Sequence, residues 1–192
     1  NHETKWSESG VTDFGHIFGG ERFKFEHKGF LFLGFNSGPL MRMADGHVVP
    51  QDITWLKDEL KKAGKEKPVF LVTHYPLLKG DVDNWYDVTD AVRPFNIRAF
   101  MGGHYHKNQF FSYDGIPGII NRSNLRGKDP VGGYSVYEVL AQRLDNTPKP
   151  QEDFDIQYVT HNYYGPTYRR STYQEISPDV IALYRYQKNN RT

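Results

Sequence analysis

The sequence lacks the residues on which several classes of protein depend. It contains no cysteine, which excludes a disulfide framework, a thiolate nucleophile and any metal site built on sulfur. A metal would therefore need His, Asp, Glu or Asn as its ligands. The formal net charge is only +1, from 24 basic and 23 acidic residues, so charge alone does not indicate binding to nucleic acid or to an anionic membrane surface.

Long apolar runs are also missing. No stretch approaches the roughly 18 consecutive apolar residues of a membrane-spanning helix, so we expect no membrane segment in this chain. The opening residues Asn1-His2-Glu3 include neither a methionine nor the pattern of a signal peptide, and they predict a processed or truncated chain. With 192 residues, the chain is long enough for one domain and an appended module.

The first half of the chain shows clear secondary-structure patterns. Within 18–35, alternating polar and apolar residues over 22–26, a turn at 27–29 and an apolar run over 30–33 predict a hairpin that enters a core. The next segment, 50–63, has apolar residues at helical spacing, Pro50 at its start and two lysines in its last turn, and predicts a helix.

The middle of the chain predicts a parallel crossover. Strands are expected at 68–72 and 97–101, with a short helix at 83–92 between them. The fold class is therefore α/β, with a domain at 1–145 and an appendage at 146–192 that is strand-rich and holds more than half of the tyrosines. Successive strands forming an antiparallel meander are expected at 109–113, 118–121 and 134–140.

Three histidines directly follow predicted strands. His74 comes after the first crossover strand, and His104 and His106 come after the second, behind a pair of glycines. Ligands of open α/β sheets bind beyond the carboxyl ends of strands, so these rings are expected to converge on one crevice. In an extended segment residues two apart face the same side, which would turn His104 and His106 the same way.

These histidines also carry a resemblance to a known family. Asn1-His2-Glu3, Thr73-His74-Tyr75-Pro76 and Gly103-His104-Tyr105-His106 resemble, in order, the last three of five motifs of calcineurin-like metallophosphoesterases. The strand 30–35 and the helix with Trp55-Leu56 resemble the exported members, which implies an exported or periplasmic parent protein. The resemblance implies the later half of a four-layer α/β/β/α sandwich.

The resemblance assigns roles to individual residues. It implies that Asn1, His74 and His104 bind one of two divalent metal ions (Mn, Fe or Zn), that His106 binds the other, and that His2 is a catalytic acid or electrostatic partner. The implied reaction is attack of a metal-activated water on a phosphate monoester or diester. Candidate substrate-binding residues are Arg122, Arg126 and His47, although a solvated polar loop explains them equally well.

The first two family motifs, Asp-x-His and Gly-Asp-x-x-Asp, would precede Asn1. The segments 45–47 and 80–83 match these motifs by letter, but neither follows an apolar strand, and we expect both to be surface turns. Without these carboxylates the three histidines would make a weak site for a hard divalent ion. The chain is therefore expected to be an inactive fragment that binds part of the metal pair or none of it.

Two further expectations concern partners. The alternative to an enzyme is a binding or assembly module that uses a degenerate phosphoesterase scaffold and the tyrosine-rich appendage to bind a sugar, a peptide or a second chain. A sheet that lacks neighbouring strands would also expose an edge and apolar residues such as Phe30, Phe32 and Phe70. Self-association into a homo-oligomer is the expected consequence.

Overall fold

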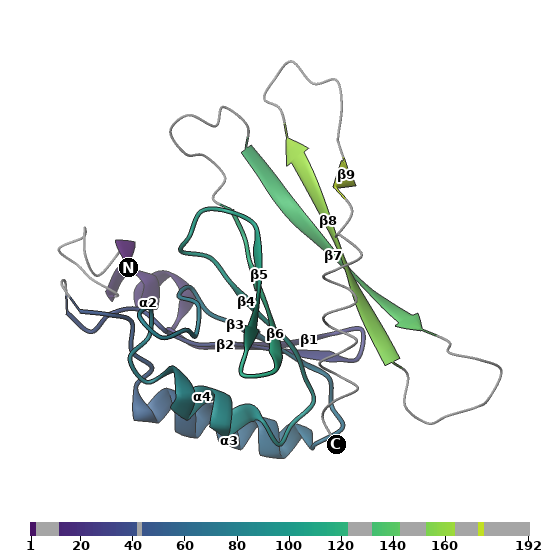
Figure 1. Cartoon of the computed structure of the whole chain (residues 1–192). Coiled ribbons are helices and arrows are strands. Elements are labelled where there is room, and N and C mark those ends of the chain that lie inside the picture. Colours follow the sequence, from purple (N-terminus) through teal and green to yellow (C-terminus); the bar gives the residue numbers. More distant parts are fainter. Residues whose placement is uncertain (3–11, 42–43, 123–131, 143–152, 164–172, 175–192) are drawn as a thin grey trace. The chain divides into compact units, whose positions relative to one another are not determined.

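The computed structural model describes residues 1–2, 12–41, 44–122, 132–142, 153–163 and 173–174, which are coloured in Figure 1. The chain forms two compact units, residues 1–121 and 122–192, and each is described by itself. The first unit contains α2 (Thr12–Phe18), β1 (Phe23–His27), β2 (Phe30–Gly34), α3 (Pro50–Ala63), β3 (Val69–Val72), α4 (Trp85–Val92), β4 (Ile97–Gly102), β5 (Gln109–Tyr113) and β6 (Ile116–Ile120).

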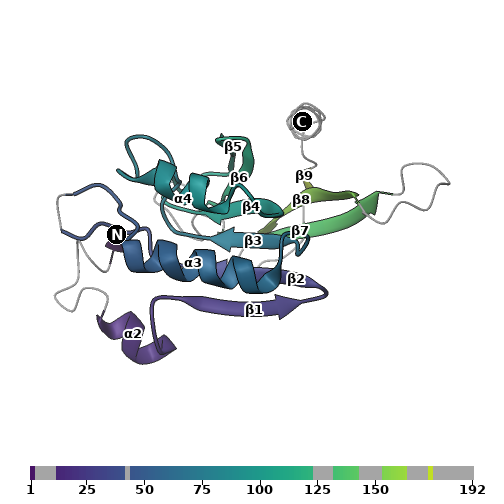
Figure 2. The ribbon, with the colours of Figure 1, turned by 90° about the horizontal axis from the view of Figure 1, so that it is seen from below.

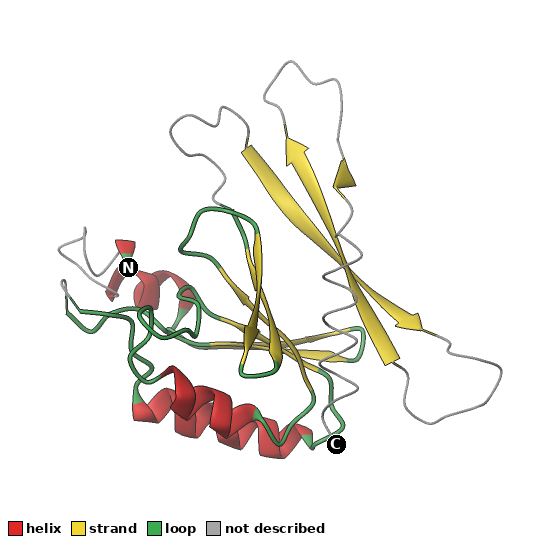
Figure 3. Ribbon diagram, viewed as in Figure 1, coloured by secondary structure: helices red, strands yellow, loops and turns green. Residues whose placement is uncertain are grey.

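The first unit is built on one mixed sheet of six strands in the order β1-β2-β3-β4-β6-β5. The inner strands β2, β3, β4 and β6 are parallel, and β1 and β5 are antiparallel strands at the two edges. The predicted parallel crossover is present: β3 and β4 are parallel neighbours, and α4 connects them (Figure 3). The prediction of an α/β fold is confirmed, while the further layers of a four-layer sandwich stay a prediction.

Helices α3 and α4 pack on the same face of this sheet, which we call the covered face (Figure 2). Leu31 and Leu33 point to this face from β2, and Leu56 and Leu60 meet them from α3; none of the four is more than 1% exposed. The spacing of Leu56 and Leu60 places both on one side of the helix. Complete burial of a leucine stabilises a fold by about 1.5–3 kcal/mol, so this layer is the main source of stability in the first unit.

The opposite face of the sheet is aromatic. The rings of Phe25, Phe32 and Phe70 are stacked across β1, β2 and β3, with centroids 4.6 Å and 5.1 Å apart, and we call these rings with Phe23 and Phe30 the aromatic face. The predicted hairpin β1–β2 is present, but the expectation that it enters a core is wrong for β1. All five residues of β1 are exposed, because no element of the first unit's described residues packs over this edge strand.

The second unit contains β7 (Gly132–Gln142), β8 (Asp153–Tyr163) and β9 (Tyr173–Gln174), which form a separate antiparallel sheet. The expected meander is confirmed for its first two strands, since β5 and β6 pair antiparallel, but it is wrong for the third, because β6 also pairs in parallel with β4 and β7 pairs with β8. The two units divide between Asn121 and Arg122. Among the described helices, none has the length and hydropathy that a membrane span requires.

Candidate functional site

The carboxyl ends of β3 and β4 lie side by side, because the two strands are parallel neighbours. Backbone hydrogen bonds continue past both strands: Thr73 N–H donates to the Met101 carbonyl and Gly103 N–H donates to the His74 carbonyl, each at 2.9 Å. These bonds hold the next side chains close together. The rings of His74 and His104 have centroids 5.5 Å apart and planes inclined by 76°.

The amino terminus lies at the same end of the sheet, near the tip of β3 in Figure 2. The Asn1 side-chain oxygen is 2.7 Å from His74 Nε2. The ring of His2 lies beside that of His106, with centroids 6.2 Å apart. We call Asn1, His2, His74, His104 and His106 the histidine cluster.

The backbone that presents His104 and His106 differs from the expected extended segment. Both residues have left-handed backbone conformations, with φ of 69° and 58°, in a series of bends between β4 and β5. The Tyr105 N–H donates to the Gly103 carbonyl at 2.8 Å, which tightens the bend. The argument that alternation turns both rings the same way is therefore wrong, because it holds only for strands. A left-handed residue other than glycine costs about 1 kcal/mol or more, and such residues concentrate at functional sites.

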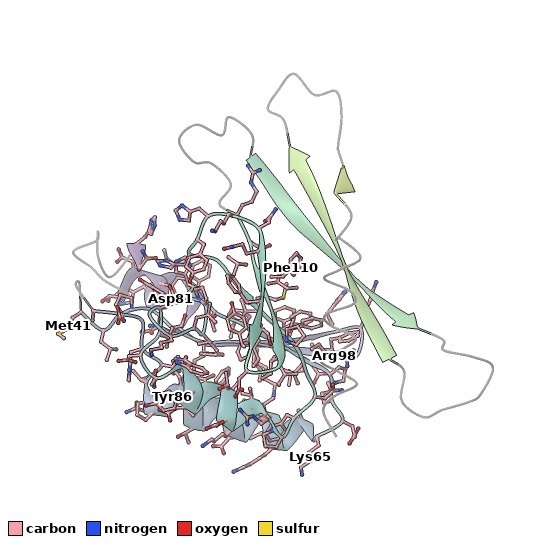
Figure 4. The ribbon with its side chains drawn as sticks, in the orientation of Figure 1. Met41, Lys65, Asp81, Tyr86, Arg98 and Phe110 are labelled. Carbon is pink, nitrogen blue, oxygen red and sulfur yellow. The ribbon has the colours of Figure 1, made fainter. Side chains whose placement is uncertain are left out.

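Two tyrosines next to the histidines support the cluster from within the protein. The ring of Tyr75 is 3% exposed and its centroid lies 4.0 Å from that of His104. The Tyr105 hydroxyl donates a hydrogen bond to Asp81, a residue labelled in Figure 4. Burial, followed by the hydrogen bond to Asp81 and its charge, raises the pKa of Tyr105 to about 12. Burial and the nearby carboxylates of Asp81 and Asp45 also raise the pKa of Tyr75, so both hydroxyls stay protonated at neutral pH.

The two segments expected to be surface turns pair with each other instead. Gly46 and Val82 form a parallel bridge, in which Gly46 N–H donates to the Asp81 carbonyl at 2.7 Å and Asp83 N–H donates to the Gly46 carbonyl at 2.9 Å. Both Gly46 and Val82 are buried. A Cβ at position 46 would lie 2.5 Å from the Ser37 carbonyl oxygen, so the bridge requires glycine there. Loop pairing of this kind has no signature in the local sequence pattern.

Two of the three candidate substrate-binding residues, His47 and Arg122, lie in the part of the chain that the structure describes. His47 lies beside the bridge, with Nδ1 2.7 Å from an oxygen of Asp83. Arg122 is half-buried and follows Asn121, whose N–H donates to the Gly102 carbonyl at 2.9 Å. Arg126 lies outside the described residues.

Sequence reasoning missed three residues that hold the histidine cluster in place. Tyr75 follows His74, and Tyr105 lies between His104 and His106, so the alternation of His and Tyr was a usable signal for aromatic packing. Asp81 had no signal, because its contact with Tyr105 joins residues that are 24 positions apart.

The donors of the histidine cluster do not make a complete metal site. The cluster offers imidazole nitrogens and one amide oxygen but no carboxylate, whereas Mn and Fe prefer sites that include oxygen donors. Among the residues that the structure describes, no group of three or more His, Asp or Glu side chains is arranged to hold a metal ion. The described residues therefore do not fit a metal pair without further ligands.

Comparison with known proteins adds little. No family model matches the chain, and no match was found among curated proteins. Among solved structures, GAP50, the anchor in the inner membrane complex of Plasmodium, matches with a TM-score of 0.40 and 11% identity over 86% of this chain and 58% of its own. A candidate 5′-nucleotidase from Staphylococcus aureus, in complex with α-ketoglutarate, matches with a TM-score of 0.39 and 14% identity over 88% of this chain and 33% of its own. At these TM-scores neither likeness assigns an activity to this chain.

Proposed function

We propose that this chain contributes the histidine-bearing part of a metal-dependent phosphoesterase site. The carboxylate ligands would come from outside the described residues. In such enzymes a metal pair supplies an activated water and binds phosphate oxygens, so no nucleophile from the protein is required. Whether the substrate is a monoester or a diester depends on groups that contact the alcohol part of the ester, and the histidine cluster does not include them.

One observation carries this proposal: three segments far apart in the sequence meet at one end of the sheet. Asn1 contacts His74, the ring of His74 lies near that of His104, and His2 lies beside His106. These are the same segments that resemble consecutive motifs of calcineurin-like metallophosphoesterases. A chance occurrence of three short motifs would not by itself bring their side chains together.

The surrounding residues are suited to hold the cluster rigid. Tyr75 packs against the His104 ring, and the hydrogen bond from Tyr105 to Asp81 anchors the bend that carries both later histidines. A rigid set of donors loses little entropy when it binds an ion or a phosphate, which favours a role in catalysis.

The test is hydrolysis of p-nitrophenyl phosphate and its bis ester, in the presence of Mn, by the complete translation product of the gene that encodes these residues. His106→Ala should lower kcat/KM by about 100-fold or more, because metals that act as a unit fail together when one ligand is lost. His27→Ala is the matched control, because His27 is an exposed histidine on β1, and it should retain the wild-type rate.

Mn binding and circular dichroism measured on the same variants separate loss of a ligand from loss of fold. Wild-type turnover by a folded His106→Ala protein would contradict the proposal. So would equal turnover by residues 1–192 alone, since that would mean that the ligands of the described residues are sufficient.

A further inference from the structure

Strand β1 is an exposed edge of the six-stranded sheet. It pairs with β2 alone in the part of the chain that the structure describes, and every one of its residues is exposed. Phe23 is 43% and Phe25 is 50% exposed, so large aromatic surface lies beside an unpaired strand. An edge of this kind is a template for pairing with another strand.

The backbone groups that β1 turns outward can be assigned from its neighbours. Leu31 N–H and Phe35 N–H donate to carbonyls at the two ends of β3, so alternate residues of β2, including Phe32, turn their backbone groups toward β1. Phe25 is the register partner of Phe32 and therefore bonds inward. Lys24 and Glu26, on either side of Phe25, turn their N–H and C=O groups away from the sheet.

The outward side of β1 is complementary to itself. If two copies of β1 pair antiparallel about a two-fold axis at Phe25, Lys24 of each copy lies opposite Glu26 of the other. These become the hydrogen-bonded positions, which exchange both backbone bonds, and the two Phe25 residues form the closer, non-hydrogen-bonded pair. Opposite charges and aromatic pairs at such positions are both favourable.

The charges already present on each copy extend this complementarity. Lys24 Nζ is 2.5 Å from a Glu59 oxygen on α3, and Lys67 Nζ is 2.8 Å from a Glu26 oxygen. Across the interface between the two β1 strands, the charged side chains would form a row. Its order would be Glu59 and Lys24 of one copy, then Glu26 and Lys67 of the second copy, so negative and positive charges alternate. On the aromatic face, the stack of Phe25, Phe32 and Phe70 in one copy would meet the same stack of the second copy at the two Phe25 rings.

We infer that β1 is a homodimer interface, in which two copies of the chain join their sheets antiparallel with Phe25 on the two-fold axis. The occupant of the edge is a second copy because the register that buries Phe25 also pairs every charge of the strand. An isologous contact of this kind closes on itself and leaves no further β1 edge to extend a fibre.

Mutual rescue between two charge variants tests this register. Lys24→Glu leaves only acidic residues at the two positions, and Glu26→Lys leaves only basic ones, so each variant alone should dimerise on the order of tenfold more weakly than wild type. An equimolar mixture of the two restores both opposite-charge pairs and should dimerise as wild type does. The double variant with both changes should dimerise more strongly than either single variant, because the charges opposite each other between copies are again complementary, although each exchanged charge meets a like charge on Glu59 or Lys67 of its own copy.

Sedimentation velocity on the full chain measures these outcomes, with circular dichroism to establish that each variant is folded. Lys57→Glu on the exposed side of α3 makes the same charge change away from the edge and should leave dimerisation unchanged. Wild-type dimers should also weaken as salt screens the charge pairs. A wild-type chain that stays monomeric overturns the inference. A mixture of folded single variants that shows no rescue also overturns it.

Discussion

The two faces of the six-stranded sheet differ in how the same strands are used. On the covered face, Leu33 and Leu71 are 0% exposed because α3 and α4 lie over them. On the aromatic face, Phe25 of the edge strand β1 is 50% exposed, whereas Phe70 of the inner strand β3 is only 3% exposed. Both faces belong to the same hydrogen-bonded sheet. The difference teaches that apolar alternation selects the face of a residue, whereas its burial also depends on whether its strand lies inside the sheet or at the edge.

The largest expected contrast is between truncations on the two faces. Leu56→Ala removes a fully buried side chain from the covered face and should lower the free energy of unfolding by about 3 kcal/mol. Phe25→Ala removes a larger side chain from the aromatic face but should cost less than about 1 kcal/mol in the monomer, since half of that ring already contacts water. Urea unfolding of dilute samples measures both.

Dilution matters in this comparison because any association through β1 would add to the apparent stability of the wild type. If Phe25→Ala were as destabilising as Leu56→Ala in dilute monomer, the aromatic face would be a second core, and the contrast between the faces would be lost.

A second contrast uses one substitution on both faces. An alanine Cβ at Gly118, on the covered face, would overlap the ring of Tyr113, which is 2% exposed and has no room to move. The same change at Gly34, on the aromatic face, would overlap the ring of Phe23, which is 43% exposed and can rotate toward solvent. We expect Gly118→Ala to cost about 2 kcal/mol and Gly34→Ala less than half of that, measured by thermal unfolding. Equal costs would mean that Phe23 is held as firmly as Tyr113.

The smallest expected effect is at the loop end of the sheet, where Tyr105 lies 5.9 Å from the Phe111 ring. The pKa of Tyr105 is raised to about 12, so its contribution to stability is complete below pH 10 and is lost as the pH rises toward 12. Tyr105→Phe should reduce the decrease in the free energy of unfolding between pH 10 and pH 12 by less than about 1 kcal/mol. The effect is small because solvent screens the charge of a partly exposed group. Tyr86→Phe, at an exposed position on α4, is the control and should retain the wild-type slope in alkaline urea titrations.

The sequence patterns predicted the elements that depend on local periodicity. The structure contains the predicted helix over 50–63, a hairpin within the predicted 18–35 and the parallel strands before His74 and His104, whose ends bring these two rings together. Each of these follows from the spacing of apolar residues and from the rule that parallel strands end at one edge.

The parts that the sequence did not predict are contacts between distant irregular segments. The bridge of Gly46 with Val82 and the hydrogen bond of Tyr105 to Asp81 join loops that carry no periodic pattern. The left-handed backbone at His104 was missed for a different reason: a histidine there goes against its own preference, and tertiary contacts override that preference.

The left-handed backbone at the two histidines has a consequence for the stability of the chain. Glycine or asparagine would adopt the backbone of positions 104 and 106 at lower cost, so a sequence optimised for stability alone would not keep imidazole at either position. Retaining two histidines there sacrifices about 2 kcal/mol of a total that is usually only 5–15 kcal/mol. The bend after β4 is therefore a place where substitutions to glycine or asparagine should stabilise the fold.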